Sequence, residues 1–151
     1  MITSLARRAH PFVLAAFAAC AVVQVFLAGL GVFNDPGAFI THREFGYLFG
    51  WLTLVGLVLA LVGRLPRRVV GMSALLLVLF ALQSVFVALR TTYPAVAALH
   101  PVNGFLLLVV GIAIARLSWV ARHEPAGAKA PAAAPETAPA TDVRPAAVEG
   151  G

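Results

Sequence analysis

The chain has 151 residues, of which 61% are hydrophobic and only 11% are charged. So few polar groups cannot cover a surface exposed to water, which excludes an ordinary soluble protein and makes a lipid bilayer the expected solvent. The net charge of +5 does not indicate nucleic acid as a partner, because the basic residues flank apolar runs. The single cysteine, Cys20, excludes an intramolecular disulfide and a cysteine-based metal cluster.

The first apolar run, residues 11–33, follows Arg7 and Arg8 and predicts a transmembrane helix. Pro11 suits the first turn of that helix because proline has no N–H to leave unpaired. A cleaved signal peptide is the alternative, but the run is too long for the apolar part of a signal. Gln24 is the only strongly polar side chain in the run, so we expect its amide to bond to another helix.

The second predicted helix covers residues 42–63 and follows the turn sequence NDPG at 34–37. Thr41, with Glu44 three residues later, forms a capping-box pattern that predicts the start of the helix at this point. The basic segment GRLPRR at 63–68 ends it. Such a short link requires the next helix to run antiparallel beside it.

The third predicted helix, residues 69–89, again contains one amide, Gln83. The fourth covers residues 100–120, where Pro101 favours the first helical position and makes His100 a candidate N-cap. The sequence therefore predicts an all-α protein, a four-transmembrane-helix bundle built from two helical hairpins.

This membrane domain is expected to occupy residues 1–123. Residues 124–151 are rich in alanine and proline with scattered charges, so we expect a disordered cytoplasmic tail there.

The distribution of lysine and arginine predicts the orientation of the bundle. With the N-terminus inside, nine of the 11 basic residues lie on the cytoplasmic side, and two, Arg43 and Arg90, lie outside. The nine are Arg7, Arg8, Arg64, Arg67, Arg68, Arg116, Arg122, Lys129 and Arg144. This pattern indicates a multi-pass protein of a bacterial inner membrane with both termini in the cytoplasm.

Two histidines begin the second and fourth predicted helices, and each is followed four residues later by glycine. These pairs are His42 with Gly46 and His100 with Gly104. Positions four apart share a helix face, so each glycine leaves a bare patch of backbone one turn deeper than its histidine. Both pairs are expected in the outer leaflet, where a flat molecule could lie against them.

The two hairpins also resemble each other as parallel repeats. Gln24 precedes His42 by almost the same number of residues as Gln83 precedes His100. Repeats related by an axis along the membrane normal would bring the two histidines to equivalent places across the bundle.

This arrangement suggests a b-type haem held by the two histidines. An imidazole at a helix N-terminus is disfavoured in its charged form by the helix dipole, which leaves a nitrogen free to ligate. Zinc or copper held by protein alone requires three or four ligands, whereas haem requires two axial ligands. The two glycines would let the macrocycle approach, and Arg43 and Arg90 could neutralise its propionates.

Four segments carry a resemblance to a known family: QVFLAGLGVF at 24–33, HR at 42–43 with GY at 46–47, GRLPRR at 63–68, and LHPVN at 99–103. Together they resemble a family of small four-helix bacterial membrane proteins of unknown function, over about residues 11–122. The resemblance implies the fold and the membrane location. It implies no activity and no catalytic residue.

Several functions therefore stay open. One is haem-based electron transfer, and another is a cofactor-free structural or accessory role in which Gln24 and Gln83 bond across helices. A third is the handling of a quinone, another small molecule or a metal ion. The lipid bilayer is the expected partner, with a membrane protein or a second copy of the chain as further hypotheses. The sequence has no catalytic triad, phosphate-binding glycine loop or glutamate-rich metal motif, so we expect no enzyme with its own catalytic apparatus.

Overall fold

The computed structural model describes residues 1–122, so the predicted disordered tail at 124–151 lies outside the described residues. The described chain is all-α. Its helices are α1 (Ile2–Phe33), α2 (Ala38–Val62), α3 (Arg67–Ala88), the short α4 (Pro94–Ala97) and α5 (Leu99–Ala121). Four stretches are long and apolar enough to cross a membrane: α1, α2, α3, and α4 together with α5. The predicted all-α architecture with four candidate membrane helices is confirmed.

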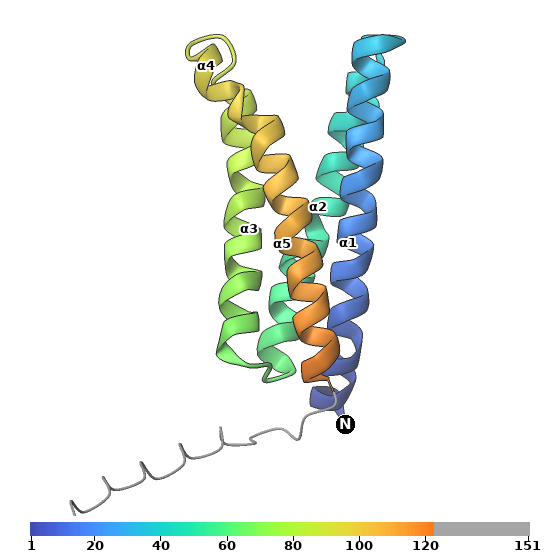
Figure 1. Ribbon diagram of the computed structural model, residues 1–151, viewed down its shortest axis with the longest axis vertical. Coiled ribbons are helices and arrows are strands. Elements are labelled where there is room, and N and C mark those ends of the chain that lie inside the picture. The colour runs from blue at the N-terminus through green and yellow to red at the C-terminus, as the bar shows by residue number, and fades with distance from the viewer. Residues whose placement is uncertain (123–151) are drawn as a thin grey trace, which may run out of the picture.

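The four long helices form a ring in which each one packs against two neighbours (Figure 1). Both α1 and α3 pack against α2 and against α5. Among the described residues, α1 and α3 make no close backbone contact, and neither do α2 and α5. These two pairs are therefore the diagonals of the ring, and side chains from α2 and α5 can meet only across its centre.

All four long helices start earlier than predicted, α3 by only two residues, at Arg67 instead of residue 69. α1 begins at Ile2 instead of residue 11, and Pro11 lies well inside it. Residues 2–10 include leucine, alanine and arginine, which favour helix, so the helix extends beyond its apolar run. Its 32 residues span about 48 Å, against a hydrocarbon layer of about 30 Å.

The predicted capping box is wrong. α2 already begins at Ala38, so Thr41 lies inside the helix, and the Glu44 carboxylate accepts hydrogen bonds from Arg43 instead of a backbone N–H. The preceding turn is held by Asp35, whose Oδ1 accepts a hydrogen bond of 2.9 Å from the backbone N–H of Gly37. A side chain two residues back, which the sequence pattern did not consider, thus closes this turn.

His100 is likewise not an N-cap. α5 starts at Leu99, one residue earlier, with Ala98 as the N-cap. The four-residue α4 directly precedes it, so the backbone is already turning when it reaches His100. Pro101 still falls in the first turn of α5, where its missing N–H costs nothing.

Tight packing is confined to the middle and one half of the bundle. The half of the bundle that holds the N-terminus and the α2–α3 turn is called here the N-terminal half. Buried hydrophobic side chains occupy this half and the middle of the bundle. They include Leu14, Phe17, Phe49, Leu76 and Ile114. Toward the opposite end, in what is called here the α4 half, Gly31 and Asn103 are the only described residues that are buried beyond the level of Ala21, Phe49 and Leu107. Figure 1 shows the α1–α2 and α3–α5 hairpins diverging toward that end.

An aromatic cluster lies where the packed region ends. Phe17 of α1, Phe49 of α2 and Phe80 of α3 contact one another, with ring centroids 5.4 Å apart for Phe17–Phe49 and 5.8 Å for Phe49–Phe80. Gly50 permits this approach, because a Cβ on it would collide with the ring of Phe80. A glycine at this place thus sets how closely α2 and α3 can pack.

We expect Gly50→Ala to lower the free energy of unfolding by about 1–3 kcal/mol, because the added methyl group must displace Phe80 from the cluster. Gly29→Ala is the matched control, since nothing lies within 4 Å of its Cβ position. Replacing a helical glycine there should be neutral or stabilising by about 0.5–1 kcal/mol. Thermal unfolding in detergent measures both changes, and equal effects would contradict the packing described here.

Candidate functional site

The two candidate histidines meet in the α4 half. His42 comes from the second turn of α2 and His100 from the first turn of α5, so they approach along a diagonal of the ring. Their ring centroids lie 6.2 Å apart, with an angle of 62° between the ring planes. The imidazoles are thus neighbours, and both are partly buried.

Each imidazole is fixed by a backbone carbonyl of the other helix in its own hairpin. His42 Nδ1 lies 3.1 Å from the carbonyl oxygen of Gln24, and His100 Nδ1 lies 3.3 Å from that of Gln83. A carbonyl oxygen can only accept, so both Nδ1 atoms carry the hydrogen and donate it. In the neutral ring this leaves Nε2 with its lone pair available to a ligand.

In the first hairpin, Gln24 and Gly46 fit against each other. The Gln24 amide donates a hydrogen bond of 2.7 Å to the carbonyl of His42, so α1 and α2 are joined twice at this level. A Cβ on Gly46 would lie only 2.7 Å from Gln24 Nε2. The bare backbone patch expected at Gly46 therefore receives the glutamine amide.

The second hairpin uses an extra side chain, Asn103. Its Nδ2 donates hydrogen bonds of 2.8 Å to the Gln83 Oε1 and to the carbonyl of Leu79, which ties α5 to α3. A Cβ on Gly104 would lie 3.5 Å from Gln83 Nε2, an ordinary van der Waals distance. Both glutamines thus bond across helices, and both hairpins repeat the same contact between an imidazole and a glutamine carbonyl.

The two candidate arginines belong to the same half of the bundle as the rings, and both are exposed. Arg43 is exposed and forms an ion pair of 2.7 Å with Glu44. Arg90 is also exposed, and its guanidinium donates to the carbonyl of Val87 at 3.3 Å. Among residues 1–122, no group of three or more histidine, cysteine, aspartate or glutamate side chains could hold a metal ion.

The sequence interpretation missed two polar features. Asn103 stood in the quoted motif but received no role, although an amide in an apolar helix is itself a signal for an interhelical bond. His10 precedes the predicted first helix at residues 11–33, yet it is fully buried on α1 in the N-terminal half. The hydropathy pattern did not indicate this burial, because it marks the apolar run at residues 11–33 and not the whole of α1.

Over residues 24–91 the chain matches DUF6220, a family of unknown function. The match confirms the resemblance to a family of unknown function, and the four long apolar helices are consistent with a membrane protein. The matched range includes Gln24, His42, Gly46 and Gln83, and it ends before His100. No curated protein and no solved structure matches the chain.

The fit between Gly46 and Gln24 gives a direct test. Gly46→Ala should displace the Gln24 amide from the His42 carbonyl and lower the free energy of unfolding by about 1–3 kcal/mol. Gly104→Ala, the equivalent change in the second hairpin, adds its methyl group at an ordinary contact distance and should cost less than about 0.5 kcal/mol. Unfolding in detergent compares the two, and a larger loss for Gly104→Ala would contradict the geometry.

Proposed function

We propose that the protein binds one b-type haem between His42 and His100 and carries electrons in the membrane. The observation that carries this proposal is the placement of the two imidazoles, from diagonally opposite helices, with centroids 6.2 Å apart. Helix bundles commonly build cofactor sites in this way, from side chains on facing helices.

The separation suits one metal ion between the rings. Two metal–nitrogen bonds of about 2 Å, plus about 1.1 Å from each nitrogen to its ring centroid, place the centroids about 6.2 Å apart. The centroids of His42 and His100 also lie 6.2 Å apart in the structure. The separation of the rings would therefore have to change little for both imidazoles to ligate the same metal ion.

The hydrogen bonds of the rings support the same role. Histidines that ligate metals usually donate their other ring N–H to a carboxylate, carbonyl or water, which fixes the tautomer and the ring orientation. His42 and His100 both make this bond through Nδ1. The alternative proposal is a structural role without a cofactor. That role explains the two hydrogen bonds through Nδ1, but it does not explain why the His42 and His100 rings lie next to each other.

The number of available ligands favours haem over a bare metal ion. A site made by protein alone requires three or four ligands, and the part of the chain described by the structure has no such group. Haem takes four equatorial nitrogens from its own porphyrin and requires only two from the protein. The α4 half, where the hairpins diverge, is also the less tightly packed half (Figure 1).

The two arginines provide charge for the acidic side of such a cofactor. Arg43 already pairs with Glu44, whereas Arg90 donates a long hydrogen bond of 3.3 Å to the backbone carbonyl of Val87. We therefore expect Arg90 to be the stronger partner for a propionate. When bound, haem would supply a one-electron couple, and two histidine ligands would leave no open position for oxygen.

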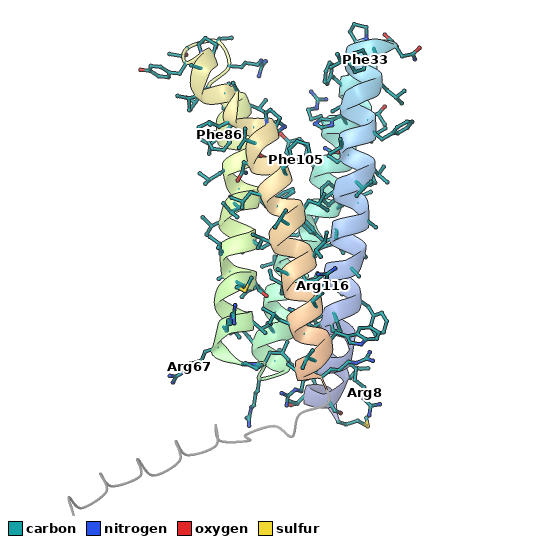
Figure 2. The ribbon with its side chains drawn as sticks, viewed as in Figure 1. Arg8, Phe33, Arg67, Phe86, Phe105 and Arg116 are labelled. Atoms are coloured by element: carbon teal, nitrogen blue, oxygen red, sulfur yellow. The ribbon has the colours of Figure 1, made fainter. Side chains whose placement is uncertain are left out.

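The same proposal includes an orientation with both termini in the cytoplasm and the histidines in the outer half. Figure 2 shows Arg8 and Arg67 at the end opposite α4. Seven described arginines belong to that half by their place in the chain, and two belong to the α4 half. Cytoplasmic loops carry the excess of basic residues, which supports this orientation.

Reporter fusions test the orientation. Fusions after Arg64 and after Arg122 should report a cytoplasmic position, and a fusion after Pro94 should report the opposite side. A periplasmic signal from the fusion after Arg64 would reverse the orientation.

Absorption spectroscopy tests the cofactor. Protein purified in detergent from haem-replete cells should show a haem spectrum, and His42→Ala and His100→Ala should each abolish or strongly shift it. His10→Gln changes a histidine in the other half and should leave the spectrum unchanged. In His100→Gly, free imidazole should restore the spectrum because it can occupy the ligand position that the mutation leaves open.

A colourless protein that also fails to take up added haemin, while both alanine variants keep the wild-type fold, would leave the cofactor-free structural role as the better account.

A further inference from the structure

A second polar group lies in the N-terminal half, away from the haem proposal. His10 of α1 is fully buried, and its Nε2 lies 3.4 Å from the hydroxyl oxygen of Ser73 on α3. Since α1 and α3 are diagonal partners, this contact crosses the centre of the bundle. Ser73 is also buried, with only 1% of its surface exposed.

The hydroxyl of Ser73 determines which nitrogen of His10 carries the hydrogen. Ser73 donates its only hydrogen to the carbonyl of Val69 at 2.9 Å, so its oxygen can only accept from the imidazole. His10 Nε2 is therefore the donor. In the neutral ring, Nδ1 is then a bare acceptor, and it is buried with no hydrogen-bond partner among the described residues.

Arg7 lies one turn earlier on the same face of α1, and its unpaired group is a hydrogen-bond donor instead of an acceptor. It is 7% exposed, and its Nε–H is a buried donor with no acceptor in the described chain. Residues three apart on a helix are neighbours on its surface. One unpaired donor and one unpaired acceptor thus lie one turn apart inside the bundle, where unpaired polar groups are costly.

The charge of Arg7 does not by itself require an anion at this place. A Cβ on Gly63 would lie 3.1 Å from the Arg7 backbone nitrogen and 3.2 Å from its Cγ, so the C-terminus of α2 packs against this arginine. Helix C-termini carry partial negative charge, which favours a cation. An anion would also face the lone pair of His10 Nδ1, whereas a cation would be repelled by the guanidinium.

We propose that the site binds one water molecule, which accepts from Arg7 Nε–H and donates to His10 Nδ1. A neutral molecule that both donates and accepts is the smallest ligand that satisfies both atoms. The bound water extends to Arg7 the contact between His10 and Ser73, which joins α1 and α3, two helices whose backbones do not touch.

Nuclear magnetic resonance on protein labelled with ¹⁵N-histidine, in lipid nanodiscs made with the full chain, tests this site. His10 should appear as the neutral form with hydrogen on Nε2, its Nδ1 resonance should be shifted as for a hydrogen-bonded acceptor, and its ring protons should show a cross-peak to water. Arg7→Met should weaken or remove the water cross-peak and move Nδ1 toward the position of a free acceptor. Arg8→Met is the matched control, because Arg8 is the adjacent exposed arginine, and it should change neither signal.

The wild-type spectrum alone can overturn the proposal, so the test does not depend on the folding of either variant. Hydrogen on Nδ1, or no cross-peak between the His10 ring and water, would refute the site. An unchanged water cross-peak in a folded Arg7→Met protein would also refute it, because the proposed water is anchored by Arg7. None of these outcomes depends on whether haem binds at the other end.

Discussion

Each hairpin depends on one hydrogen bond that crosses between its helices, from the Nδ1–H of a histidine to the backbone carbonyl of a glutamine. Within a bilayer, an imidazole N–H without a partner is costly, whereas a helical carbonyl has a second lone pair to offer. The bond therefore satisfies the ring, sets its tautomer and fixes the level at which the two helices meet. It also turns the remaining nitrogen, Nε2, into the only ring position that can bind a ligand. The amides of Gln24, Gln83 and Asn103 strengthen the same level of the bundle.

Packing and polarity divide the molecule into two halves with different physical properties. In the N-terminal half, glycines such as Gly50 and Gly111 let aromatic rings approach the backbone, and the core is filled by side chains. In the α4 half, hydrogen bonds replace much of this packing, because almost no described side chain is buried there. A rigid packed half can position the two imidazoles, while a loosely packed half leaves space beside them for a flat ligand. This division is the physical basis for placing the haem proposal in the α4 half.

Much of this architecture could be predicted from the sequence because the bilayer imposes long apolar helices and short links impose antiparallel neighbours. The pairing of His42 with His100 followed from the internal repeat. Helix starts could not be read in the same way. The capping-box pattern at Thr41 predicts a start there, but the turn held by Asp35 lies earlier in the chain, and α2 begins directly after it at Ala38. The burial of His10 was equally hidden, because its contact with Ser73 joins residues far apart in the sequence. Hydropathy reports what faces lipid and cannot report which polar groups meet inside.

Electron paramagnetic resonance of the oxidised, purified protein reports the axial ligands of a ferric haem and so tests whether His42 and His100 both bind one iron. Two histidine ligands place the iron in a strong ligand field, so we expect a low-spin signal that is lost when either His42 or His100 is replaced. A high-spin signal, or a low-spin signal that survives replacement of either histidine, would contradict the proposed site.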